Sequence, residues 1–315
     1  PILQTIEVGR APHGLQVEAN FLYVANAGDD TIGIVDLETG QQIDTIPAPN
    51  VPLDLIRYQQ GWLVTAFRGT TLNHIDQDGH VLQTFEVGKS PSLFSQGHQP
   101  NIISVVSEFA DQVSMFNKEK NQVTQNIKTG QRPYPSHVTK DGILLFTPNR
   151  MDGTVSVYDL LNNEPVTTIS ACKNPEGGAL TKDEASYMVA CGGDDKVLFI
   201  NTASFKVTHD VSQGIGPRPF SVIAGPDGRY AYINNAGGES ISVIDLKSKQ
   251  VSHNIATGKQ PIVMRIFDRK LYVANEVSNT ITVIQLPSKP EKHADQKNQV
   301  IMMGMIHSGH VNSTR

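Results

Sequence analysis

Short apolar stretches alternate with polar turns along almost the whole chain. The stretches are four to six residues long, rich in Val, Ile, Thr and Tyr, and interrupted by Gly-Asp, Asp-Gly and related pairs, which is typical of strands and hairpins. Residues 220–224, 230–234, 240–245 and 250–255 illustrate four such strands in succession. The longest uninterrupted apolar run, 300–306, is far shorter than the ~20 residues that cross a bilayer. The pattern predicts an all-β chain without a transmembrane segment.

The strand pattern repeats with a fixed period. A polar residue that ends a strand recurs every 40 to 44 positions, at Asp36, Asp76, Asn117, Asp159, Asn201, Asp245 and Gln285. A proline upstream of it keeps nearly the same spacing, at Pro12, Pro52, Pro91, Pro133, Pro175, Pro219 and Pro261. Repeats of this length identify solenoids and propellers, and four antiparallel strands make a propeller blade. The sequence therefore predicts a seven-bladed β-propeller with four strands per blade.

The two ends of the repeat region predict how the ring closes. The seventh unit stops after its third strand at Leu286, whereas the chain opens with a lone strand over residues 2–8 that matches the fourth strand of other units. We expect this N-terminal strand to complete the last blade, which removes open sheet edges. The predicted organisation is a propeller over residues 1–288, followed by a short C-terminal extension over residues 289–315, consisting of a linker and a tail that contains Met and His.

Several segments carry a resemblance to a known family. The segments LYVAN at 22–26 and 271–275, TIGIVDLETG at 31–40 and SISVIDLKSK at 240–249 resemble the YVTN-type β-propeller repeat. With a single Trp, the chain cannot supply the Trp-Asp motif of each WD40 blade. The resemblance implies an exported protein, periplasmic or extracellular. It does not fix a function, because related propellers include lactone hydrolases, redox enzymes and proteins that only bind.

Charge suggests a binding surface at one end of the channel. The net charge of −5 argues against a chain whose whole surface serves nucleic acid, and we predict no sequence-specific contact with it. Six of the seven loops that precede the aligned prolines, here called lead-in loops, nevertheless carry a cation, and two loops between second and third strands add another. These residues are Arg10, Arg68, Lys89, Arg132, Arg150, Lys173, Arg218 and Lys259. They predict a positive mouth that holds an anionic small molecule, polymer or protein partner; the alternative is that a basic residue before Pro only marks the turn.

The residues that follow the aligned prolines should line the same mouth. They are His13, Leu53, Ser92, Tyr134, Glu176, Phe220 and Ile262. His13, Tyr134 and Glu176 are the candidates for acid–base chemistry. Their combination loosely resembles the lactone-hydrolysing propellers, which makes a lactone or ester hydrolase the alternative to a binding protein. His13 and Glu176 belong to opposite blades, however, and a Glu176–Lys173 pair is the simpler interpretation, so the sequence leaves open whether the protein is an enzyme.

Metal chemistry has weak support. His137 alternates away from Tyr134, which predicts a core histidine with its hydrogen bonds satisfied, and the other propeller histidines do not converge as a metal site requires. The tail contains Met302, Met303, Met305, His307 and His310, which could ligate copper and serve a copper-dependent oxidoreductase. The alternative is an apolar patch that docks on a blade or on another subunit. No cofactor is identified.

The two cysteines fall within one predicted blade. Cys172 lies in the lead-in loop of blade five, and Cys191 ends the second strand of that blade. Both should lie on the mouth side, where a bridge forms if their Cα atoms come within ~7 Å. A disulfide and two free thiols both remain open.

Overall fold

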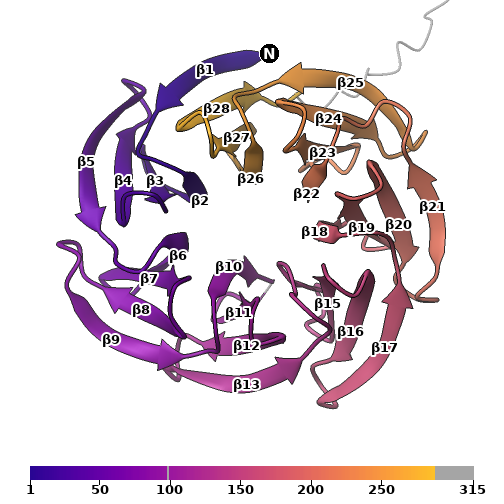
Figure 1. Ribbon diagram of the computed structural model, residues 1–315, viewed down its shortest axis with the longest axis horizontal. Helices are drawn as coiled ribbons and strands as arrows, with labels where there is room; N and C mark the ends of the chain where they lie inside the picture. Colours follow the sequence, from indigo (N-terminus) through magenta and orange to yellow (C-terminus); the bar gives the residue numbers. More distant parts are fainter. Residues whose placement is uncertain (98, 288–315) are drawn as a thin grey trace, which may run out of the picture.

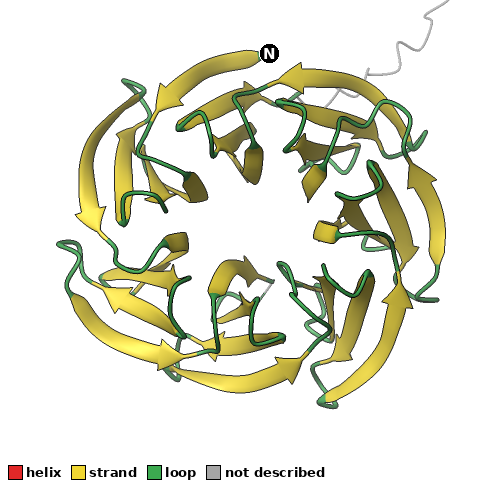
Figure 2. Cartoon of the chain, viewed as in Figure 1, coloured by secondary structure: helices red, strands yellow, loops and turns green. Residues whose placement is uncertain are grey.

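Seven four-stranded antiparallel sheets surround a central channel in the computed structural model, which describes residues 1–97 and 99–287 (Figure 1). The described chain contains 28 strands and no helix (Figure 2). It accordingly has no helix long and apolar enough to span a membrane. The predicted seven-bladed propeller is confirmed.

Each blade contributes one strand to each of four concentric layers. The innermost strands are β2 (Pro12–Glu18), β6 (Pro52–Tyr58), β10 (Pro91–Gln96), β14 (His137–Val138), β18 (Pro175–Leu180), β22 (Pro219–Ala224) and β26 (Pro261–Phe267). The second strands are β3 (Phe21–Asn26), β7 (Gly61–Ala66), β11 (Ile102–Ser107), β15 (Leu144–Asn149), β19 (Ser186–Cys191), β23 (Tyr230–Asn235) and β27 (Lys270–Asn275). The third strands are β4 (Thr31–Asp36), β8 (Thr71–Ile75), β12 (Gln112–Asn117), β16 (Thr154–Asp159), β20 (Lys196–Asn201), β24 (Ser240–Asp245) and β28 (Thr280–Gln285). The outermost strands are β5 (Gln41–Pro47), β9 (Val81–Glu86), β13 (Gln122–Lys128), β17 (Glu164–Ser170), β21 (Val207–Val211), β25 (Gln250–Ala256) and β1 (Ile2–Glu7).

The N-terminal strand closes the ring. β1 pairs antiparallel with β28, and the last sheet has the order β1-β28-β27-β26 (Figure 1). Ile6 lies opposite Ile281 and is buried in a cluster that also contains Val283. The predicted closure is therefore correct, and it joins the two ends of the repeat region in one sheet.

The hydrophobic core lies between the blades. Seven clusters of buried residues form, and each joins side chains from adjacent blades. Between blades one and two, for example, Trp62 packs on Tyr23 with ring centroids 4.3 Å apart. Because each blade buries its two faces against two neighbours, the ring must be complete before every core is covered.

A buried Asn explains the recurring end of the second strand. The side-chain amides of Asn26, Asn149, Asn235 and Asn275 donate to a Thr or Ser hydroxyl on the neighbouring third strand. The lead-in glycine of the same blade lies against this side chain. A Cβ on Gly9, Gly130, Gly216 or Gly258 would come within 2.9 Å of it, so only glycine fits there.

The lead-in loops share one backbone conformation. The residue before the aligned proline has a φ between 49° and 60° in all seven blades, at Ala11, Val51, Ser90, Arg132, Asn174, Arg218 and Gln260. In four of these loops its backbone N–H donates to a side chain of the preceding blade, from Val51 to Asp30, Arg132 to Asp111, Arg218 to Asp195 and Ala11 to Asn279. These bonds connect neighbouring blades at the end of the channel where the predicted mouth lies.

A side-chain turn explains the polar residue that ends the third strands. In Asp36, Asn117, Asp159, Asn201 and Asp245, one side-chain oxygen accepts the backbone N–H groups two and three residues further on. Asp and Asn favour this turn because their short side chains reach their own backbone. The period found in the sequence therefore reports the hairpin between the third and fourth strands.

Blade four departs from the predicted strand pattern. Its innermost strand, β14, covers only two residues, and Pro133 makes an isolated bridge to Asn149 upstream of it. Pro133 and Pro135 have no N–H to donate, which interrupts the ladder at this point. The alternation expected from Tyr134 to His137 is therefore lost.

Cys172 and Cys191 form a disulfide within blade five, with Cα atoms 5.9 Å apart. The bond ties the lead-in loop of the blade to the end of β19. It closes a short loop, because the two cysteines are 19 positions apart in the sequence.

We expect Ile6→Ala to destabilise the whole ring. Removing most of a fully buried side chain costs about 2–5 kcal/mol of unfolding free energy, and here the loss falls on the closing sheet. Thermal unfolding by circular dichroism should show a melting temperature several degrees lower. The neighbouring exposed Thr5→Ala is the matched control and should leave it almost unchanged; equal effects of the two variants would contradict the closing role of β1.

Removing the disulfide should lower the free energy of unfolding, because the unfolded chain then gains the conformational entropy that the closed loop restricts. For a loop of this length the expected loss of unfolding free energy in Cys172→Ser/Cys191→Ser is about 3 kcal/mol. Urea unfolding checks it. Reductant should destabilise the wild type to the same extent and leave the variant unaffected, and a wild type insensitive to reductant would argue against the bond.

Candidate functional site

The eight predicted cations separate into two classes according to their position in the lead-in or connecting loop. Those two positions before the proline, Arg10, Lys89, Lys173 and Lys259, are exposed, and so is Arg68, which lies two positions after the end of β7. Arg10 forms an ion pair with Asp29 of its own blade while its side chain stays 72% exposed. These five residues belong to the outer surface of the loops.

The other three cations occupy inward positions. Arg132 and Arg218 come directly before their prolines, and Arg150 comes directly after β15. We call these three residues the arginine sector. Arg132 Nη2 lies 3.1 Å from Glu108 Oε2, and Arg150 Nε lies 3.1 Å from Glu176 Oε1. Arg218 is exposed and has no carboxylate oxygen within 4.0 Å among the described residues.

Glu176, the partner of Arg150, has a strongly shifted pKa. It lies at the start of β18 and its side chain is only 1% exposed. Burial raises its pKa to about 7, although the positive charges of Arg150 and Arg218 act in the opposite direction. One of its oxygens, Oε2, is buried without a hydrogen-bond partner in the described chain. Near neutral pH the group is therefore divided between its charged and neutral forms.

Aromatic and apolar side chains lie beneath the arginine sector. Tyr134 and Phe220 meet edge to face with ring centroids 5.3 Å apart, although they come from blades four and six. Tyr134 and Leu93 pack against the cluster that contains Phe220 and Ile262. Burial, together with Glu108 and Glu176, raises the pKa of Tyr134 well above its ordinary value, so its hydroxyl stays neutral. We call these four residues the apolar floor.

His13 does not pair with Glu176. Its Nε2 lies 3.5 Å from Glu276 Oε1, a residue of the adjacent blade seven, and Gln260 also donates to Glu276. Glu176 pairs with Arg150 rather than with Lys173. His13 and Glu176 therefore each contact a different partner on a neighbouring loop.

Glu108 and Glu276 are members of the mouth that the sequence analysis did not identify. Both come directly after the second strand of their blades, at the position that Arg150 occupies in blade four. Aligning the strand ends across the repeats would have placed all three in one inward column. With their carboxylates included, the mouth carries both signs of charge, which corrects the expectation of a purely positive ring.

His137 also differs from its expected role. It lines a cavity of about 590 Å³ at the opposite end of the channel, where the hairpins between first and second strands lie. Its Nδ1 is buried and has no partner among the described residues, so it is not a satisfied core histidine. The physical reason is the short β14, which starts the alternation anew after Pro135.

The predicted copper ligands lie outside the described residues, and so does the extension that contains them. In the part of the chain that is described, His80 is grouped only with Asp76 and Asp78 of its own exposed turn, and its Nδ1 pairs with Asp76 at 3.1 Å. This turn is remote from the channel mouth, since it connects the third and fourth strands of blade two.

Comparison with known proteins supports the fold. No known family profile matches the chain, and no characterised protein sequence does. Among solved structures, a chain of hydrazine synthase from Kuenenia stuttgartiensis is similar with a TM-score of 0.77 and 16% identity, covering 89% of this chain and 97% of that one. Virginiamycin B lyase from Staphylococcus aureus is similar with a TM-score of 0.74 and 14% identity, covering 90% and 99%. At such identities the likeness shows a shared propeller fold.

The raised pKa of Glu176 predicts a pH-dependent stability. The folded protein holds this proton up to about pH 7, whereas the unfolded chain releases it near pH 4.5, so the contribution of Glu176 to the unfolding free energy falls as the pH rises between these values. The difference between wild type and Glu176→Gln should decline by about 3 kcal/mol over this window. Urea unfolding at several pH values measures it.

Glu276→Gln is the matched control of opposite sign. His13 holds the pKa of Glu276 below its ordinary value, so this residue stabilises the folded protein above about pH 4.5 and loses that effect as the pH falls through the folded pKa. A flat difference for Glu176→Gln between pH 4.5 and 7 would mean that the carboxyl titrates normally.

Proposed function

We propose that this protein is a binding propeller whose arginine sector holds the anionic group of a ligand or partner. Two buried polar atoms carry the proposal. Arg132 Nε and Glu176 Oε2 have no hydrogen-bond partner in the described chain, although nearly all buried polar groups in proteins have one. A donor and an acceptor left open beside three guanidinium groups favour a bound polar molecule over a closed structural network.

The charge distribution supports one side of the mouth as the binding region. The arginine sector contributes three positive charges, opposed by Glu108 and by Glu176, which is only partly ionised at neutral pH. Arg218 has no carboxylate partner within the described residues, and guanidinium groups hold carboxylates and phosphates through paired hydrogen bonds. On the other side of the mouth, Glu276 already has two partners, because its Oε1 lies 3.5 Å from His13 Nε2 and its carboxylate accepts a hydrogen bond from Gln260.

Apolar side chains beside the sector favour an organic anion or an acidic protein partner. The Arg132 guanidinium lies over the ring of Phe109, 4.5 Å from its centroid, and this ring is 50% exposed. Met151, next to Arg150 in the sequence, is 60% exposed. Exposed aromatic and Met side chains beside Arg are common in binding surfaces.

An oxidising compartment is the proposed location. The disulfide of blade five supports it, because such bonds persist in the periplasm or outside the cell and are rare in the cytosol. The resemblance to YVTN-type repeats agrees with this proposal.

Citrate is a suitable small polycarboxylate probe of the arginine sector. We expect Arg218→Ala to weaken citrate binding about tenfold, measured by isothermal titration calorimetry, because it removes an unpaired charge without leaving a buried carboxylate behind. Binding should also weaken between 50 and 200 mM NaCl, since exposed charges are screened.

Two further variants make the test specific. Arg150→Ala/Glu176→Gln removes the buried pair together and should also reduce affinity, whereas Arg10→Ala, whose side chain lies on the outer surface, should bind citrate as the wild type does. Equal losses in Arg10→Ala and Arg218→Ala would indicate general charge attraction and would argue against the arginine sector.

A further inference from the structure

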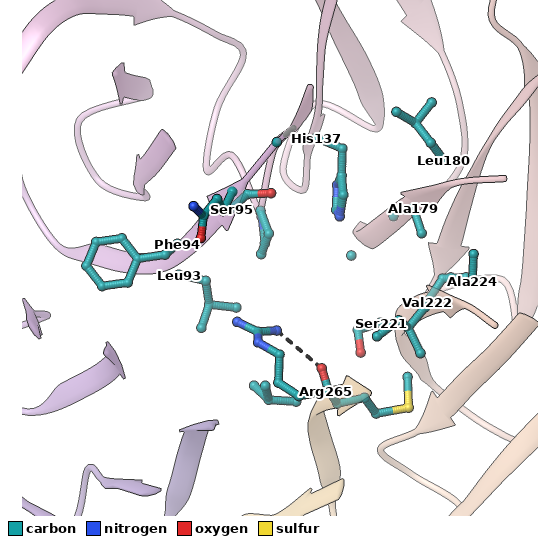
Figure 3. A pocket seen from close by; sticks show the side chains of 18 of the residues that line it. Leu93, Phe94, Ser95, His137, Ala179, Leu180, Ser221, Val222, Ala224 and Arg265 are labelled. Atoms are coloured by element: carbon teal, nitrogen blue, oxygen red, sulfur yellow. Dashed lines mark hydrogen bonds between the residues drawn. The ribbon is translucent and has the colours of Figure 1, made fainter. Parts of the chain in front are cut away.

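A cavity lies at the end of the channel opposite the arginine sector. It has a volume of about 590 Å³ and is lined by the innermost strands of six blades together with Gln16 of blade one. Figure 3 shows Arg265, His137, Leu93 and Ser221 around this space, contributed by four different blades. Cavities of this size are typical of sites for small molecules. Leu93 and Ile262 of the apolar floor line it as well, so the floor separates this cavity from the arginine sector.

One guanidinium is held in place inside the cavity. Arg265 Nη2 donates to Asp54 Oδ2 at 3.0 Å, and Nη1 donates to the carbonyl oxygen of Met264 at 3.2 Å. Asp54 is buried and is itself fixed by the backbone N–H groups of Leu55 and Phe94, each at 3.0 Å. Arg265 remains 38% exposed and reaches into the space between the blades (Figure 3). Since a guanidinium has five N–H donors, donors remain for a ligand.

Two aromatic side chains of blades four and five each carry an unsatisfied polar atom. His137 Nδ1 and Tyr187 Oη are buried without partners in the described chain, and their rings have centroids 5.8 Å apart. Burial, together with the positive charge of Arg265, lowers the pKa of His137 to about 4, so its imidazole is neutral and can accept a hydrogen bond. Gly178 of β18 lies against Tyr187. A Cβ at Gly178 would lie 2.3 Å from the Tyr187 hydroxyl, so no side chain fits at this position.

The remaining wall is largely apolar. Four innermost strands, each from a different blade, contribute apolar side chains to it: Leu55, Leu93, Val222, Ile262 and Met264. At its rim, the ammonium groups of Lys140 and Lys182 donate to backbone carbonyl oxygens of the next turn along the ring. Those two charges are therefore engaged at the opening, and Arg265 is the cation that the lining residues present inside.

We propose that this cavity binds a small organic monocarboxylate, with its carboxylate on Arg265 and its apolar part against Leu93, Val222 and Met264. The N–H donors that Arg265 does not use on Asp54 and Met264 suit one carboxylate and not a phosphate dianion, which needs more donors. The apolar wall favours a hydrocarbon body over a sugar or an inorganic ion. This site is independent of the arginine sector and uses none of its residues.

Benzoate and its neutral analogue benzamide test the site directly. In NMR titrations of the full chain, we expect benzoate to shift the methyl resonances of Leu93, Val222 and Met264, and benzamide to bind at least about tenfold more weakly, as expected when a charged contact is lost. Arg265→Gln should reduce benzoate affinity by a similar factor. Equal binding of the two compounds would overturn the proposal.

A steric variant keeps the test decisive if Arg265→Gln disturbs the fold. Ser95 lines the cavity (Figure 3), and no hydrogen bond of its hydroxyl is found in the described chain, so Ser95→Phe should fill the space and abolish benzoate binding while the melting temperature is retained. Arg218→Ala should leave benzoate binding unchanged. If Arg218→Ala removed benzoate binding and Ser95→Phe did not, benzoate would be binding at the arginine sector and the second site would be refuted.

Discussion

Burial of both faces of every blade is the constraint on which this structure depends. A four-stranded sheet alone leaves an apolar face open, and each of the seven core clusters joins side chains of adjacent blades. The ring closes because β1 pairs with β28, the third strand of the last blade. The stability of any one blade is thus a property of the whole ring.

The polar residues of the channel mouth occupy two positions that recur in every blade. The residue before each proline and the residue after each second strand point toward the mouth, and there Arg132 meets Glu108 while Gln260 meets Glu276. The same two columns in other blades hold small or apolar residues, such as Ala11 and Ala27. One backbone framework therefore presents polar residues in blades three to seven and small or apolar residues in blades one and two.

The sequence was sufficient to predict the fold, but it was not sufficient to predict which charged residues of the channel contact one another. Strand ends at Asp36 or Asn26 are set by local hydrogen bonds within one blade, so their period predicts seven blades correctly. The partner of Glu176 is decided across loops, by distances that no spacing in the chain encodes. Asp54 and Arg265 are 211 positions apart, and only ring closure brings them together. Charged residues within the otherwise apolar segments PLDLI and IVMRI were the available sign of this contact.

The lead-in loops hold their shape through main-chain groups. In four blades the residue before the proline is held by a hydrogen bond from its own backbone N–H. These four residues are Ala11, Val51, Arg132 and Arg218. Their side chains make none of these four hydrogen bonds. Seven such positions encircle one opening, which makes the ring a natural scaffold for redesign: recognition residues can be exchanged there one blade at a time, much as loops are varied on an antibody, without rewriting the architecture beneath them.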